Sequence, residues 1–165
     1  MKKAVVIVRI CAAVLCVISM ILIFSFSADN ADESGQKSAE VTEKIVQTVD
    51  PTIVEKPIEE QRRVYETVGS YVRKSAHFLE FAMLGFFASI MVNTIYPDFL
   101  RRFLIPLGFG ALYAVADEIH QIFVPGRACE FTDFLIDSAG VSIGILLSIA
   151  IFAIFRRILL KKAQK

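Results

Sequence analysis

Long, mostly apolar runs dominate this chain, and they limit what it can fold into. Residues 4–26 are apolar except for one arginine and two serines. At about 1.5 Å per residue, a helix of that length crosses a hydrocarbon core of about 30 Å. Three more runs of similar length follow at residues 75–96, 103–124 and 131–155. The sequence therefore predicts an all-α integral membrane protein built as a bundle of four transmembrane helices.

The first apolar run has a second interpretation, a cleaved signal peptide, because Lys2 and Lys3 give it a basic start. A signal peptide needs a short apolar core followed by a cleavage site of small residues. Here the run is long, and the only candidate cleavage pattern, at residues 25–27, is weak. We therefore expect a retained transmembrane helix over residues 4–26.

A polar interval, residues 27–73, separates the first run from the other three. Apolar residues recur in it at near-helical spacing, first at Val41, Ile45 and Val49 and again after Pro57. The pattern predicts two short amphipathic helices in a helical segment outside the cytoplasm, between the first and second spans.

Short connections join the last three spans, because turn-forming residues occur at positions 97–98 and 125–127. The three spans should therefore be antiparallel neighbours within a single membrane domain, residues 1–165. Basic residues gather before the first span, at Arg101 and Arg102, and after the last span. Because lysine and arginine are retained on the cytoplasmic side, this pattern places both termini in the cytoplasm.

Three basic residues contradict that pattern and fall on the outer side: Arg73, Lys74 and Arg127. We expect acidic side chains to lie beside them.

The overall charge gives no reason to expect a nucleic-acid partner. The chain has 18 basic and 17 acidic residues and a formal net charge of +1. A nucleic-acid-binding surface needs a basic patch with interleaved aromatic residues, and the sequence has none.

Polar residues inside membrane spans are costly, and here they gather near the outer ends of three spans. Lys74, His77 and Glu80 recur every three residues, so one helix face carries them. The remaining members are Asp117, Glu118, His120, Gln121, Arg127, Glu130, Asp133 and Asp137. Contact with lipid would cost about 2.5–3.5 kcal/mol for a charged group deep in a span. We therefore expect these residues to face one another in an outer polar layer.

Four kinds of chemistry fit the outer polar layer, and the residues alone do not decide among them. Imidazole and carboxylate groups can bind a divalent metal ion, although no His-Glu-x-x-His signature is present. Either histidine, oriented by Glu80 or Asp117, can act as a general base at the level of the lipid headgroups. Lys74 and Arg127 can hold an anionic group of a headgroup or an antibiotic. The fourth alternative is a structural salt-bridge network.

Glycine spacing indicates close packing between spans. Gly140 and Gly144 form a Gly-x-x-x-Gly pattern on the fourth span, which permits close approach of a neighbouring helix. Gly108 and Gly110 should likewise permit close approach of a neighbouring helix to the third span.

Three segments resemble the VanZ-like family of bacterial membrane proteins. They are residues 73–81 (RKSAHFLEF), residues 117–127 (DEIHQIFVPGR), and Asp133 with residues 137–140 (DSAG). The segments follow the order of the family's last three spans, and the end of the first span (FSFS) also resembles the family's start. The family's recurring polar positions correspond to Lys74, His77, Glu80, Glu118, Gln121, Arg127 and Asp133.

The resemblance implies a role in the cell envelope but supplies no reaction, since the family is named for a teicoplanin resistance protein of Gram-positive bacteria. We expect a multi-pass protein of the cell membrane that contributes to antibiotic resistance against lipoglycopeptides such as teicoplanin. The outer polar layer would form a pocket for a lipid-linked cell-wall precursor or a glycopeptide. The alternative is a membrane-embedded transferase or hydrolase with histidine and carboxylate groups and a divalent metal. A bundle of this size can also form homo-oligomers.

Overall fold

The computed structural model describes residues 2–163, and all regular secondary structure within them is helical. The α-helices are α1 (Lys2–Ser27), α2 (Ala31–Val49), α3 (Ile58–Asn93), α4 (Phe99–Gln121) and α5 (Phe131–Ala163), with a single 3-10 turn, η1 (Ile53–Glu55), before α3. Four of them, α1, α3, α4 and α5, are long and apolar enough to cross a membrane. The prediction of an all-α, four-span membrane protein is confirmed.

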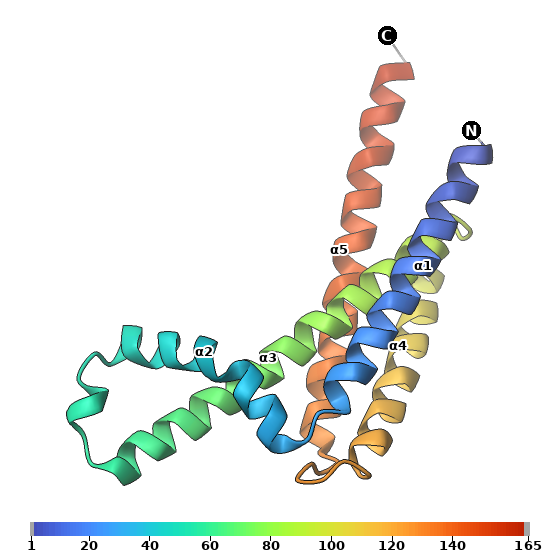
Figure 1. Cartoon of the computed structure of the whole chain (residues 1–165). Coiled ribbons are helices and arrows are strands. Elements are labelled where there is room, and N and C mark those ends of the chain that lie inside the picture. Colours follow the sequence, from blue (N-terminus) through green and yellow to red (C-terminus); the bar gives the residue numbers. More distant parts are fainter. Residues whose placement is uncertain (1, 164–165) are drawn as a thin grey trace.

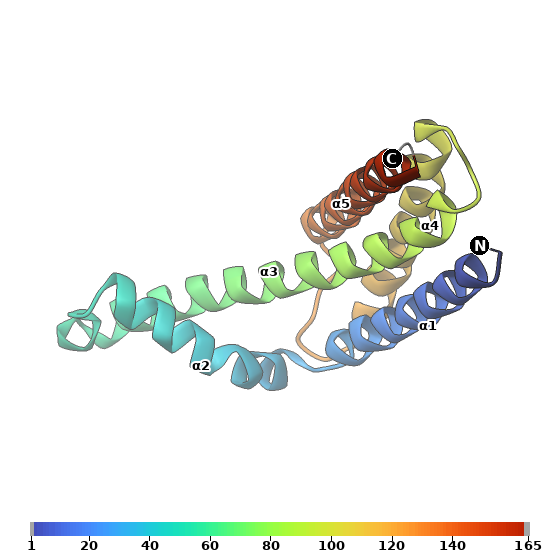
Figure 2. The ribbon, with the colours of Figure 1, turned by 90° about the horizontal axis from the view of Figure 1, so that it is seen from above.

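Helix α3 is the centre of the molecule, because it packs against α1, α2, α4 and α5. Both ends of the chain lie at one end of the bundle, and the connection between α4 and α5 lies at the other (Figure 1). Seen from above, α1, α4 and α5 surround one half of α3, and α2 runs beside the other half (Figure 2). This arrangement is that of four antiparallel spans with their termini together.

Helix α2 and the first half of α3 form a side arm, residues 31–73, that projects sideways from the bundle (Figure 1). The side chain of Asn30 accepts a hydrogen bond from the Glu33 amide at 2.9 Å, and the Glu33 carboxylate accepts one from the Asn30 amide at 3.2 Å. This capping box starts α2. The first predicted amphipathic helix is therefore present, but the second is the beginning of α3.

Helix α3 is continuous over 36 residues, about 54 Å, and is therefore longer than a membrane is thick. No proline interrupts it between Pro57 and Pro97, so nothing in the backbone separates its polar first half from its apolar second half. Other boundaries also differ slightly from the apolar runs. Asp98 caps the start of α4 by accepting a hydrogen bond from the Arg101 amide at 2.9 Å, so this helix begins four residues earlier than predicted.

Glycines allow α3 and α5 to cross at close range. A Cβ atom added at Gly140 would lie 2.3 Å from the carbonyl oxygen of Phe78, and one at Gly144 would lie 1.9 Å from that of Ala82. Gly85 of α3 faces the backbone of Val141 in the same way, at 2.3 Å. We call Gly85, Gly140 and Gly144 the glycine seam. The predicted role of the Gly-x-x-x-Gly pattern is thus confirmed.

The third span contributes less to close packing than predicted. Gly110 faces the side chain of Val141, and a Cβ atom added at Gly110 would lie 2.6 Å from it. At Gly108, no atom lies within 4 Å of an added Cβ, so this residue does not serve a helix contact among the described residues.

Candidate functional site

A pocket opens at the end of the bundle that carries the α4–α5 connection, and most of the predicted outer polar layer lines it. Its volume is ≈ 210 Å³. The lining residues come from α3, the end of α4, the following loop and the start of α5: Ser70, Arg73, Lys74, His77, Glu118, Gln121, Gly126, Arg127, Ala128, Glu130, Asp133, Ile136 and Asp137.

The loop between α4 and α5 turns sharply and directs Arg127 back toward α1. Gly126 has a φ of 75°, a conformation that glycine adopts without steric cost. The Arg127 guanidinium donates hydrogen bonds to the carbonyl oxygens of Asp29 at 3.2 Å and Phe26 at 3.4 Å. These bonds tie the loop to the end of α1, where helix carbonyls have no partner in their own helix.

Lys74 connects α3 to the beginning of α5. Its ammonium group donates to Glu130 Oε2 at 3.1 Å and to Asp133 Oδ1. The hydrogen bond from Lys74 lowers the pKa of Glu130 below its ordinary value. Lys74 therefore has the acidic partners that its position predicted.

Arg73 and Arg127 do not have such partners. Among residues 2–163, no carboxylate lies within ion-pair distance of either guanidinium. Burial lowers the pKa of Arg127, and the positive charge of Arg73 lowers it further. Two guanidinium groups close enough to repel each other therefore line one pocket. Such a pair can bind an anion.

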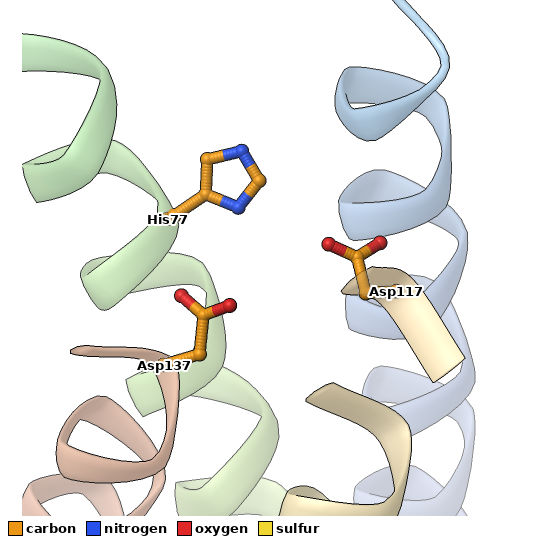
Figure 3. Close-up of side chains that lie close together, drawn as sticks. All are labelled: His77, Asp117 and Asp137. Carbon is orange, nitrogen blue, oxygen red and sulfur yellow. The ribbon is translucent and has the colours of Figure 1, made fainter. Parts of the chain in front are cut away.

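His77, Asp117 and Asp137 form a buried cluster, with one residue from each of α3, α4 and α5. One potential ligand atom of each lies within 4.8 Å of those of the other two. Figure 3 shows the three side chains pointing into a shared space. Asp117 is 4% exposed and Asp137 is 1% exposed. These three residues could hold a metal ion.

The two aspartates of this cluster differ in their hydrogen bonds. Asp117 Oδ2 accepts from the Ser27 hydroxyl at 2.8 Å and from the Gln121 amide at 3.0 Å. Neither carboxylate oxygen of Asp137 has a donor within the described structure. The Asp137 side chain is therefore buried and unpartnered.

Glu118 holds the start of α5, because its Oε2 accepts a hydrogen bond from the Glu130 amide at 2.8 Å. Its Oε1 is buried without a partner among the described residues.

Three of the predicted site residues, Glu80, Asp117 and His120, do not line the main pocket. His120 stacks on Phe24 of α1, with ring centroids 4.5 Å apart. Glu80 lies one turn deeper on α3, where it shares a second surface hollow with His77 and has a buried, unpartnered Oε2. Neither His120 nor Asp117 lines the main pocket, so a general-base pair made of these two side chains would not face a ligand bound there.

Sequence reasoning missed Arg73 and Ser27 as site residues. For Arg73 a signal existed, since its expected location on the outer side contradicts the charge rule and it is four residues from His77 on the same helix face. For Ser27 no signal existed, because its hydrogen bond to Asp117 joins residues 90 positions apart.

A comparison with protein families matches the chain to the model described as VanZ/LLP1 over residues 12–156. No curated protein and no solved structure matches the chain. The matched range runs from within α1 to within α5 and includes every residue that lines the pocket. The chain is a multi-pass membrane protein of the VanZ/LLP1 family.

Proposed function

We propose that this protein lowers the susceptibility of its cell to lipoglycopeptides such as teicoplanin. In this proposal it lies in the cell membrane with both termini in the cytoplasm, and its pocket opens on the outer face. The pocket binds the anionic part of a lipid-linked cell-wall precursor or of the glycopeptide itself. Family membership supports a role in the cell envelope.

The observation that carries the proposal is the pair of guanidiniums in an open pocket, Arg73 and Arg127, that have no carboxylate partner among residues 2–163. Guanidinium groups bind phosphate and carboxylate through two parallel hydrogen bonds. Lys74 contributes little positive charge of its own, because Glu130 and Asp133 neutralise it. The two arginines are therefore the groups that a ligand anion would meet.

The position of the pocket supports a ligand at the membrane surface. It lies where α4 ends and α5 begins, two helices that are apolar along most of their length. A lipid-linked anion would reach the two arginines with its hydrocarbon chain still in the bilayer.

One observation favours an enzyme as the second candidate. His77 lines the pocket and stands beside Asp117 and Asp137, so an imidazole with carboxylate neighbours faces the space where a ligand would bind. Such a group can transfer a proton to or from a bound substrate. In that case the protein is a transferase or hydrolase acting on the lipid-linked ligand.

The test is complementation of a deletion strain, scored as the minimum inhibitory concentration of teicoplanin. Wild-type protein should restore resistance, and Arg73→Gln should leave the strain as sensitive as the deletion. Arg101→Gln is the matched control, because Arg101 is exposed and lies beside the α3–α4 connection, away from the pocket. Membrane abundance of each variant is measured by immunoblot.

The proposal fails if the deletion changes teicoplanin sensitivity no more than sensitivity to an unrelated antibiotic. It also fails if Arg73→Gln, present at wild-type abundance, restores full resistance. An enzyme would further be indicated if His77→Gln abolished resistance while the purified variant still bound the lipid-linked precursor.

A further inference from the structure

We propose that His77, Asp117 and Asp137 bind a divalent transition-metal ion at the buried end of the pocket. The site takes one imidazole nitrogen and two carboxylate oxygens, from three different helices. It is independent of the proposed function, since the ion would bind whether or not the pocket holds a ligand.

The arrangement of the three side chains fits such an ion. Their ligand atoms lie within 4.8 Å of one another, and all three side chains point into the same space (Figure 3). Tetrahedral ligands about 2.1 Å from a zinc ion lie about 3.4 Å apart. The side chains would therefore close by roughly 1 Å around an ion, a movement within the range of small side-chain rotations.

The unpartnered carboxylate of Asp137 is the second, independent observation. This side chain is 1% exposed, and neither of its oxygens has a hydrogen-bond donor among the described residues. A carboxylate buried without donors is strongly disfavoured. Lys74, which lines the same pocket, bonds to Glu130 and Asp133 instead. A bound cation would supply the missing partner.

The hydrogen bonds around Asp117 support the same assignment. Both Ser27 and Gln121 donate to Oδ2 of Asp117, so the other oxygen accepts no hydrogen bond from the described side chains and remains available to an ion. Outer partners that fix the orientation of a ligand side chain are typical of metal sites.

The ligand chemistry selects the class of ion. A histidine nitrogen favours zinc and the two carboxylates also suit manganese, whereas calcium takes six to eight oxygen ligands and magnesium usually keeps several waters. His77 and Asp137 also line the pocket, so the remaining coordination positions would face its interior. Those positions would take water or, if the proposed function holds, an oxygen of the bound anion.

The experiment uses the full-length protein in detergent, stripped with a chelator and then dialysed against Zn²⁺ or Mn²⁺. Bound metal is measured by mass spectrometry, and Tm is measured with each metal alone and with Mg²⁺. We expect about one Zn²⁺ or Mn²⁺ per chain and a Tm raised by several degrees, because an ion that binds only the folded state stabilises it. Mg²⁺ should give a much smaller shift at the same concentration.

Matched variants assign the site. Asp137→Asn and His77→Gln should lose the bound metal and the Tm increase. Asp133→Asn, one helical turn before Asp137, and His120→Gln, whose ring lies against Phe24, should retain both. Asp137→Asn keeps the shape of the side chain and removes a buried charge, so it should fold even if His77→Gln does not.

Two results would overturn the proposal. One is a wild-type protein that retains no metal and shows no Tm increase with Zn²⁺ or Mn²⁺. The other is an Asp137→Asn variant that binds metal as the wild type does. In the first case, a higher Tm for Asp137→Asn than for wild type would indicate that the buried carboxyl group costs stability and has no ion to offset that cost. None of these measurements involves teicoplanin, so their failure is distinct from failure of the proposed function.

Discussion

Replacing Gly140 by alanine should push α3 and α5 apart next to the pocket. The added Cβ would lie 2.3 Å from the carbonyl oxygen of Phe78, whereas ordinary contact begins at 3.4 Å, so the two backbones must separate by about 1.1 Å (3.4 − 2.3). No side-chain rotation can relieve the contact, because the clashing atom is backbone. Overpacking of this kind costs about 1–3 kcal/mol. For a chain of this length the Tm should fall by roughly 2–12 °C.

Gly108→Ala is the matched control, since an added Cβ there meets nothing within 4 Å. Alanine favours the helical state by up to about 1 kcal/mol over glycine, so this variant should equal or exceed the wild type in Tm. Both proteins are compared in the same detergent by thermal unfolding. If Gly140→Ala were as stable as Gly108→Ala, the close crossing of α3 and α5 would be refuted.

Two further predictions concern the polar contacts at either end of the bundle. Lys74 lowers the pKa of Glu130, so this contribution to stability is present above about pH 4.3 and is lost as the pH falls below it. The Tm of the wild type should fall more steeply in acid than that of Lys74→Met, and parallel profiles would contradict the contact. Arg9 donates to Oγ1 and the carbonyl oxygen of Thr94 at 2.7 and 2.8 Å. Arg9→Met should therefore lose about 1.5–3 kcal/mol in thermal unfolding, and Arg101→Met less than about 0.5 kcal/mol.

The four spans could be predicted from the sequence because a membrane selects helices by length and hydropathy alone. Each apolar run must satisfy its own backbone within the bilayer, whatever it packs against. The boundary between the polar interval and the second span could not be predicted in the same way. Residues 64–72 have the spacing of an amphipathic helix, but a helix does not end where its surroundings change from water to lipid. Only a breaking residue ends it, and α3 has none before Asn93.

The sequence predicts that the polar residues lie at a similar depth, but it does not predict in which direction each side chain points. Asp117, Glu118 and Gln121 fall within about 100° of one another around α4 and are buried, whereas His120 falls on the other side of Asp117. The sequence places all four at the same depth. Which face of α4 meets α1 depends on the packing of the whole bundle, and that packing sets His120 against Phe24. The spacing of the polar residues therefore could not show which of the two histidines, His77 or His120, lines the pocket.

The distance in sequence between the two sides of the pocket has a consequence for biosynthesis. Helix α3 leaves the ribosome well before α5, and the contacts of Lys74 with Glu130 and Asp133 join residues 56 and 59 positions apart. Until α5 is inserted, Lys74 on α3 lacks those two partners. The glycine seam is then also incomplete, because only the α3 side of it is present. Insertion of α5 therefore completes the pairing of Lys74, the helix crossing and the pocket in one late step. A chain that stops before α5 has neither the crossing nor the site.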